Sequence, residues 1–271
     1  GVKVIPVVVD HGLQNGSAEI TAQTVAKLKK IGYTQIESAV AQVTLTDGLE
    51  ASARRARYQI FNQFIDTYRA KYFLLAHTLN DQAESVLLGL ARGSGARSLS
   101  GMAVVNGKIV RPLLSVTREV TEQACKDLGL DAWSDPHNFN AEFSRVRVRT
   151  QVLPVMEKEI GPGIAEALAR TASLLRDDAD ALDQLTDRTA QGHDLASLEI
   201  EFLAELPKAI RTRLIRRAIY AQGDPMGSVT ADHVSAVEAL ITAWHGQGEI
   251  SLPGGVKVAR ISGRLSAYAR S

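Results

Sequence analysis

The sequence predicts an α/β fold with a doubly wound, mainly parallel sheet, followed by a smaller and mainly helical domain. Three observations support this prediction. Short apolar, β-rich runs alternate with segments of helical periodicity through the first half of the chain, which is typical of parallel sheets covered by helices. Two of these runs are followed by polar residues, Asp10 and His77, as expected where a sheet meets a ligand. After Pro162 the pattern changes to amphipathic helices and then to a β-hairpin.

The first half of the chain alternates strands and helices in order. The first helical segment is followed by Gly32, which suits the left-handed conformation of a helix C-cap. Over residues 145–149 arginine alternates with valine, but the segment leads into a helix, so its state stays open. We expect strands over residues 2–9, 35–43, 72–76 and 108–114, and helices over residues 18–31, 49–69, 81–91 and 117–128.

The second half of the chain is predicted to be mainly helical. A long amphipathic pattern over residues 164–185 indicates one helix that leads into a second domain. We expect further helices over residues 195–221 and 230–244, and a hairpin over residues 250–260 and 265–268. The predicted domains are residues 1–152, a linker helix over residues 153–190, and a helical domain with the terminal hairpin over residues 191–271.

The composition describes an ordinary globular protein and excludes several classes. Hydrophobic residues make up 45% of the chain and charged residues 23%, and no apolar run is long enough to span a bilayer. Cys125 is the single cysteine, which excludes an internal disulfide and a cysteine-built zinc or iron–sulfur site. No leader pattern opens the chain, so we expect a cytoplasmic protein with no membrane partner. The oligomeric state stays open, a homodimer included.

The segment His77 to Glu84 is the most informative part of the chain. Asp81 and Glu84 are three residues apart at the start of a helix, and that spacing places both carboxylates on one helical face. Together with His77 they suit a metal-bound nucleotide or an amine. The alternative is an acidic first turn that stabilises the helix dipole, and the local pattern does not decide between the two.

Arginine is concentrated in three places, although the net charge of +1 gives no strong indication of a nucleic-acid partner. Each cluster alone is better explained as a solvated face than as a phosphate-binding patch, but three of them make a polyanionic partner plausible. The clusters are Arg54, Arg55 and Arg57; Arg145, Arg147 and Arg149; and Arg211, Arg213, Arg216 and Arg217.

Taken together, the motifs resemble those of the tRNA(Ile)-lysidine synthetases, a family of the PP-loop ATP-pyrophosphatase superfamily. The similarity covers nearly the whole chain, and the motifs are specific as a set. They are Val9-Asp10-His11-Gly12-Leu13; Gly48-Leu49-Glu50-Ala51 with Ala53-Arg54, Ala56-Arg57-Tyr58; His77, Asp81-Gln82, Glu84 with Arg92-Gly93-Ser94-Gly95 and Leu99-Ser100-Gly101-Met102; Arg111-Pro112-Leu113-Leu114; Asp135-Pro136 with Asn138; and Leu252-Pro253-Gly254-Gly255.

The resemblance implies an ATP-dependent ligase that uses Mg²⁺. In this family the wobble cytidine of a CAU-anticodon tRNA(Ile) is adenylated with release of pyrophosphate, and the amine of free L-lysine then displaces AMP at C2. The product, lysidine, changes codon reading from AUG to AUA. The fold implied is a PP-loop ATPase domain followed by a domain that binds tRNA or substrate.

The resemblance also implies roles for individual residues. Asp81, Glu84 and His77 are the catalytic candidates, and Asp81 is also the candidate Mg²⁺ ligand. Asp10, His11, Gly93 and Gly95 would bind ATP, and Arg92 and Arg111 would meet phosphate or the lysine carboxylate. Trp133, Tyr58 and Phe139 are candidates for base stacking, although packing explains each of them better. The candidate tRNA-binding residues are Arg54, Arg55, Arg57, Arg145, Arg147, Arg149, Arg213, Arg216 and Arg217.

The sequence departs from the family pattern in three places. Asn80 and Val146 stand where the family usually has Asp and Asn. The superfamily's Ser-Gly-Gly-x-Asp-Ser phosphate loop, expected before Val2, is absent from the sequence, so we expect the natural protein to carry a segment before Gly1. Two other functions stay open, namely another PP-loop tRNA-modifying enzyme and a non-catalytic RNA-binding remnant.

Overall fold

The computed structural model describes residues 2–10, 12, 16–42, 44, 49–93, 95–133, 135–223 and 228–269. The chain divides into two compact units. The first takes the residues up to Leu75 together with Val104–Pro112, and the second takes Ala76–Ala103 and Leu113–Ser271. The second unit is discontinuous because the helix that follows Leu75 packs on the long helix of the second half of the chain.

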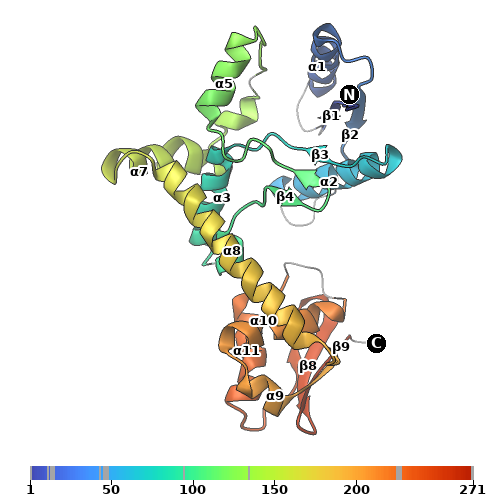
Figure 1. The fold of residues 1–271 in the computed structure, drawn as a ribbon, viewed down its shortest axis with the longest axis vertical. Helices are drawn as coiled ribbons and strands as arrows, with labels where there is room; N and C mark the ends of the chain where they lie inside the picture. The colour runs from blue at the N-terminus through green and yellow to red at the C-terminus, as the bar shows by residue number, and fades with distance from the viewer. Residues whose placement is uncertain are drawn as a thin grey trace. The chain divides into compact units, whose positions relative to one another are not determined.

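The first unit contains parallel strand pairs, as predicted. β1 pairs with β2 in parallel, with Val7 opposite Glu37, and β3 pairs with β5 in parallel, with Phe73 opposite Ile109. β4 is antiparallel to β5. Figure 1 shows these short strands with α1 and α2. The elements are β1 Val7–Asp10, α1 Ser17–Ile31, β2 Glu37–Val40, α2 Leu49–Thr67, β3 Phe73–Leu74, β4 Val105–Asn106 and β5 Ile109–Val110.

The first unit differs from the sequence prediction mainly in its strand lengths. The strand predicted over residues 108–114 ends at Val110, and the chain turns from Pro112 onward. Proline has no N–H to donate to a sheet, which explains the early end. Gly32 adopts a left-handed conformation at φ 110°, as its predicted C-cap role requires.

The second unit is organised around one long helix, α8. Figure 1 shows this helix running from α3 and α7 to the helices and strands of the C-terminal part. Ala83, Val148 and Leu153 form the core between α3, α7 and α8. The elements before α9 are α3 Leu79–Ala91, α4 Ala96–Leu99, α5 Arg118–Asp127, a 3₁₀ turn Pro136–Phe139, α6 Ser144–Arg147, a π-helical turn Val148–Val152, α7 Leu153–Glu159 and α8 Ile164–Ala190.

The arginine-rich segment, which the sequence left open, is helical. α6, the π-helical turn and α7 follow one another without a break. Val146 and Val148 are buried, so the apolar positions of the segment pack inside the unit. The helix also separates the arginines: residues 145 and 149 are four apart and share a face, whereas Arg147 bonds the backbone of Ala141 and Glu142.

The C-terminal part combines three helices with a four-stranded antiparallel sheet of order β6-β9-β8-β7. The helix predicted over residues 195–221 is wrong in detail, because the chain forms a strand first and the helix is interrupted before Pro207. Leu214, Ile219, Val237 and Val256 lie in the fully buried core between helices and sheet. The elements are β6 Ser197–Glu199, α9 Ile200–Glu205, α10 Lys208–Ala221, α11 Ala231–Thr242, β7 Ile250–Ser251, a 3₁₀ turn Pro253–Gly255, β8 Val256–Ile261 and β9 Arg264–Ala269.

The predicted fold class is confirmed: parallel strands with helices are followed by a mainly helical part with terminal strands. Among the described residues, no helix is both long and apolar enough to cross a membrane.

Candidate functional site

The start of α3 is held by a capping box between Thr78 and Asp81. The Thr78 hydroxyl accepts from the Asp81 backbone N–H at 3.4 Å, and Asp81 Oδ2 accepts from the Thr78 N–H at 2.7 Å. The Thr78 hydroxyl also donates to Asp81 Oδ2 at 2.9 Å. Asp81 therefore stabilises the helix terminus, which is the structural role that the sequence left as an alternative.

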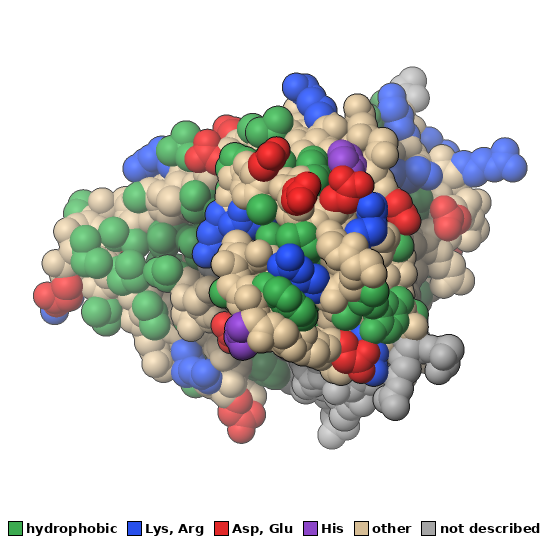
Figure 2. Space-filling view, turned by 90° about the horizontal axis from the view of Figure 1, so that it is seen from below, with side chains coloured by type: hydrophobic (Ala, Val, Ile, Leu, Met, Phe, Trp, Pro, Cys, Tyr) green, Lys and Arg blue, Asp and Glu red, His purple; other side chains and the backbone are tan. Residues whose placement is uncertain are grey.

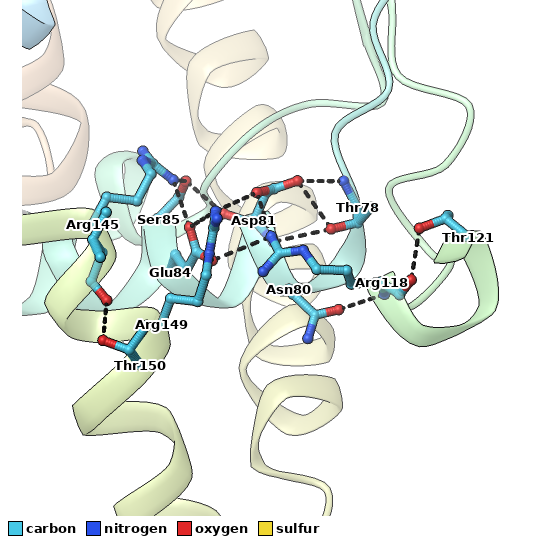
Figure 3. Close-up of polar contacts among 11 residues, drawn as sticks. Thr78, Asn80, Asp81, Glu84, Ser85, Arg118, Thr121, Arg145, Arg149 and Thr150 are labelled. Carbon is cyan, nitrogen blue, oxygen red and sulfur yellow. Dashed lines mark hydrogen bonds and ion pairs between the residues drawn. The ribbon is translucent and has the colours of Figure 1, made fainter. Parts of the chain in front are cut away.

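The second carboxylate, Glu84, has no exposed side-chain surface and is surrounded by arginines. Arg149 Nε donates to its Oε1 at 2.7 Å and Arg149 Nη2 to its Oε2 at 3.2 Å, a two-bond guanidinium–carboxylate pair. Arg118 Nη2 lies 3.5 Å from Oε1, and Arg145 Nη1 lies 3.4 Å from Oε2. Figure 3 shows these arginines converging on α3.

The two carboxylates share their arginines. Asp81 Oδ1 accepts from Arg118 Nη2 at 3.0 Å and from Arg149 Nη2 at 3.4 Å. Burial alone would lower the pKa of the Arg149 guanidinium, but its hydrogen bond to Glu84 and the two negative charges outweigh burial, and the pKa is raised. In these contacts two carboxylates face three guanidinium groups. We call Asp81, Glu84, Arg118, Arg145 and Arg149 the α3 charge cluster.

Sequence reasoning missed Arg118 as a member of this cluster. Its backbone N–H donates to Asn80 Oδ1 at 2.8 Å, so Asn80 fixes the start of α5 beside α3. An aspartate oxygen could accept the same bond, so the departure from the family's Asp leaves this contact possible. No local pattern marked Arg118, because its partners are more than thirty residues away in the sequence.

A cavity of about 370 Å³ opens beside the cluster, within the size range of small-molecule sites. Glu84, Arg118 and Arg149 contribute to its wall, and three further acids line it. One of these, Glu157, accepts the backbone N–H groups of Gly163 and Ala165 at the start of α8. The other two, Glu119 and Glu166, have no hydrogen bond or ion pair with any described residue. The lining residues are Leu79, Asn80, Glu84, Thr117, Arg118, Glu119, Arg149, Leu153, Pro154, Glu157, Gly163, Ala165 and Glu166.

Gln82, between the two acids, positions a loop. Its amide accepts from Met102 N at 2.8 Å and donates to Met102 O at 3.1 Å. Gly101 has φ +59°, and a Cβ there would lie 2.6 Å from the Gln82 side chain, so the contact requires glycine. Arg176 of α8 donates to the carbonyls of Ser100 and Gly101 at 2.6 and 2.7 Å. The Leu99 to Met102 motif is therefore held by α3 and α8.

Asp81 does not fit a Mg²⁺ ion. Its carboxylate already accepts from Thr78 N, Thr78 Oγ1, Arg118 and Arg149, which fills the capacity of two carboxylate oxygens. Two guanidinium groups at this distance would also repel a divalent cation. Across the described residues, no group of three or more His, Cys, Asp or Glu side chains suits a metal ion.

The predicted ATP-binding residues fall in different settings. Asp10 is buried at the end of β1, and its Oδ1 accepts from Gly12 N at 2.8 Å. His11 lies outside the described residues. Gly93 has φ +62° after α3, and Gly95 is the N-cap of α4. Half-buried His77 directly precedes the capping residue Thr78, and Arg92 is exposed at the end of α3.

In the first unit, the arginines of α2 gather around Tyr58. Arg54 Cζ lies 4.8 Å from the ring centroid, and Arg54 Nη2 donates to the Tyr58 hydroxyl at 3.1 Å. Arg111, buried directly after β5, donates to the same hydroxyl at 2.9 Å. Arg55 bonds the Ser52 hydroxyl. Burial, followed by the charge of Arg54, lowers the pKa of the half-buried Arg57.

The arginines of α10 bond to other parts of the second unit. Arg211 pairs with Glu238 of α11 at 2.7 Å, and Arg213 Nε donates to Asp183 of α8 at 2.9 Å. Arg217 pairs with Asp187, and Arg216 donates to the Val229 carbonyl. On the face shown in Figure 2, acidic and basic side chains are interspersed. The tRNA-binding role of Arg213, Arg216 and Arg217 stays a prediction, and the structure gives each an intramolecular bond.

Comparison with known proteins identifies the class of the chain. Residues 1–156 match the PP-loop domain model, and residues 198–266 match the TilS substrate binding domain model. A solved U34-tRNA thiolase with a [4Fe-4S] cluster, from Methanococcus maripaludis, has a similar fold at 18% identity and a TM-score of 0.51, over 64% of this chain and 62% of that one.

Curated relatives narrow the class to one family. A tRNA(Ile)-lysidine synthase of Thermobifida fusca is 48% identical over 98% of this chain and 82% of its own length. Proteins of the same name from Leifsonia xyli and Streptomyces coelicolor are 47% and 46% identical, over 97% and 98% of this chain and 80% and 77% of their own lengths. The chain belongs to the tRNA(Ile)-lysidine synthase family.

Proposed function

We propose that the chain modifies the wobble cytidine of tRNA(Ile) in an ATP-dependent reaction, with free L-lysine as the second substrate. Family membership supports the tRNA substrate and the use of ATP. The observation that carries the proposal within the structure is the α3 charge cluster, because it combines the buried carboxylate of Glu84 with guanidinium groups on the wall of a cavity.

The cavity suits a zwitterion that carries an additional cation. Arg118 and Arg149 offer guanidinium groups to the α-carboxylate of lysine. Glu119 and Glu166 lie on the same cavity wall and suit ammonium groups. An apolar amino acid would bring only its α-ammonium group to these two glutamates, whereas lysine brings two ammonium groups, which is a basis for selecting lysine.

The lysine amine must lose a proton before it attacks C2. In this proposal Glu119 or Glu166, which face the ammonium groups, accepts that proton, and Glu84 holds the guanidinium groups that meet the lysine carboxylate. Asp81 keeps the start of α3 in place, and Glu84 and His77 stay catalytic candidates beside it. Mg²⁺ is not assigned to Asp81. The ATP-binding roles of Asp10, His11, Gly93 and Gly95 stay proposals, as does homodimer formation.

Incorporation of labelled lysine tests the function directly. The full-length gene product is mixed with ATP, Mg²⁺ and an unmodified CAU-anticodon tRNA(Ile) transcript. ATP-dependent transfer of label to the tRNA is expected, with a tRNA(Met) transcript as the control for specificity. Binding of the tRNA without transfer would contradict the ligase proposal and favour a non-catalytic RNA-binding protein. AMP release that does not depend on lysine would favour another PP-loop modification.

The placement of lysine has its own test. Glu166→Gln is expected to raise KM for lysine about tenfold or more with little change in KM for ATP, because a charge-assisted hydrogen bond contributes about 1.5 kcal/mol or more. Glu159→Gln is the matched control, since Glu159 is an exposed acid of α7 that pairs with Lys158. Equal KM values for lysine in the two variants would contradict the placement of lysine beside Glu166.

A further inference from the structure

We propose that Tyr58, Arg54 and Arg111 form a binding site for a phosphate group, in which the Tyr58 hydroxyl donates a hydrogen bond to a phosphate oxygen. The proposal concerns the first unit alone. It deepens the proposed function, because both a nucleotide and a tRNA carry phosphate. It adds Tyr58 as a binding residue and groups with it two arginines that the sequence placed in different roles.

The first step is the hydrogen-bonding capacity of the hydroxyl. A tyrosine hydroxyl has two acceptor positions and one proton to donate. Guanidinium groups can only donate, so Arg54 at 3.1 Å and Arg111 at 2.9 Å occupy both acceptor positions of Tyr58. The proton must then point to a third group. The hydrogen bonds among the described residues give it no acceptor.

The second step is that the ring is fixed in place. Its centroid lies 5.4 Å from that of Phe61, which stacks on Phe73 at 4.4 Å. Phe61 belongs to the buried core. The Arg54 guanidinium covers the face of the Tyr58 ring. The hydroxyl is therefore held in position before a ligand arrives, which lowers the entropic cost of binding.

The third step is the location of the group. Arg111 directly follows β5, which runs parallel to β3, so its side chain starts at the carboxyl end of a parallel pair. Ligands of open α/β sheets bind beyond these ends. Arg54 is exposed on α2 and accessible to a ligand. Arg57 lies on the same helix, and its pKa is lowered first by burial and then by the charge of Arg54.

Neighbouring guanidinium groups with a hydroxyl donor between them suit an oxyanion with several oxygens. A phosphate group accepts hydrogen bonds from the hydroxyl and from guanidinium N–H groups together, and such charge-assisted bonds are about twice as strong as neutral ones. A carboxylate has fewer acceptor oxygens and would engage fewer of these donors. The site therefore fits a phosphate of ATP or of the tRNA backbone.

The test uses Tyr58→Phe, which keeps the ring and its packing and removes the hydroxyl. The matched control is Tyr68→Phe, because the Tyr68 hydroxyl bonds Glu37 rather than arginine. Affinities are measured in two arms on the full-length gene product, with ATP alone and with the tRNA(Ile) transcript at two salt concentrations. We expect Tyr58→Phe to weaken one arm about fivefold to tenfold, and Tyr68→Phe to leave both unchanged.

The affected arm identifies the source of the phosphate. Weaker binding of ATP assigns the site to the nucleotide, and weaker binding of tRNA assigns it to the backbone. Arg54→Gln is the second variant if Tyr58→Phe fails to fold, because Arg54 is exposed. If the site binds tRNA, Arg54→Gln should also reduce the salt dependence of tRNA binding by about one phosphate contact. Both affinities within twofold of wild type in these variants would overturn the site.

Lysine transfer by the wild type separates this inference from the proposed function. If the wild type transfers lysine and Tyr58→Phe binds ATP and tRNA as tightly as the wild type, the phosphate site is refuted and the ligase proposal stands. If the wild type does not transfer lysine but Tyr58→Phe binds ATP or tRNA more weakly than the wild type, the ligase proposal is refuted and the phosphate site is supported.

Discussion

The arginines of α10 and those of α2 look alike in the sequence and behave differently in the structure. On α10, Arg211 and Arg213 meet Glu238 and Asp183 of neighbouring helices. On α2, Arg54 covers the ring of Tyr58 and shares the tyrosine hydroxyl with a buried arginine. An arginine that bonds an acid of its own protein stabilises the fold, whereas an arginine on an aromatic ring keeps N–H groups for a ligand.

The α3 charge cluster lies between these two cases. Its arginines bond acids, as those of α10 do, but in the α3 charge cluster three guanidinium groups share two carboxylates. Two of these arginines, Arg118 and Arg149, also line a cavity. The comparison predicts that the acids around an arginine cluster, rather than the number of arginines, separate a structural cluster from a binding cluster.

The largest expected effect is the loss of Glu84. Glu84→Gln removes the charge that holds Arg149 and Arg118 and leaves three guanidinium groups close together around one acid. The side chain is fully buried, so we expect the free energy of unfolding to fall by about 3 to 5 kcal/mol. Urea unfolding measures the change. A loss below about 1 kcal/mol would show that the cluster is not needed for the fold and would weaken this comparison of arginine clusters.

The next effect concerns Glu157, an acid of the same cavity that bonds backbone groups instead of arginine. Its pKa is lowered first by the hydrogen bond from Ala165 N–H and also by that from Gly163, against a smaller opposing effect of burial. Glu157→Gln is expected to cost about 1 kcal/mol, as for the loss of a helix cap.

The contribution of Glu157 to the free energy of unfolding should decrease as the pH falls. A carboxyl group whose pKa is lower in the folded state stabilises the fold above its unfolded value, near 4.5, and that stability is lost as pH falls through the folded pKa. Urea unfolding between pH 3 and pH 6 should show the gap between wild type and Glu157→Gln closing at low pH. Glu159→Gln should remain within about 0.5 kcal/mol of wild type throughout, because Glu159 is exposed. A gap that widens at low pH would contradict the assigned sign.

The comparison also shows what the sequence could and could not predict. The strand and helix around Asp81 and Glu84 were predictable, because the capping residue, the acid spacing and the apolar run lie within a few residues. The state of residues 145–149 was not, because arginines at alternate positions fit a strand, while residues 145 and 149 fit one face of a helix equally well. In the structure the segment is helical, and the face that carries Arg145 and Arg149 contacts Glu84.

Long-range partners account for the remaining differences. Arg118 joins α3 from a segment with no distinguishing local pattern. β6 spans Ser197–Glu199 and forms only because β9 supplies its hydrogen bonds, so its own periodicity is too short to read. The interruption of the helix before Pro207, in contrast, was visible in the sequence as a helix-breaking residue.

The smallest expected effect separates the two arginine clusters most directly. Arg213→Gln removes a partly exposed pair with Asp183, so we expect a loss of about 0.2 to 1 kcal/mol in the free energy of unfolding. If this pair commits the guanidinium to the fold, tRNA affinity stays unchanged, and the predicted tRNA-binding role of Arg213 is wrong. Arg54→Gln removes an exposed side chain, so stability should stay within about 0.5 kcal/mol of wild type. Urea unfolding and a tRNA titration on both variants measure the contrast. A weaker tRNA affinity in Arg213→Gln would mean that a guanidinium paired with an acid still serves the ligand, and the distinction between the α10 and α2 arginines would no longer hold.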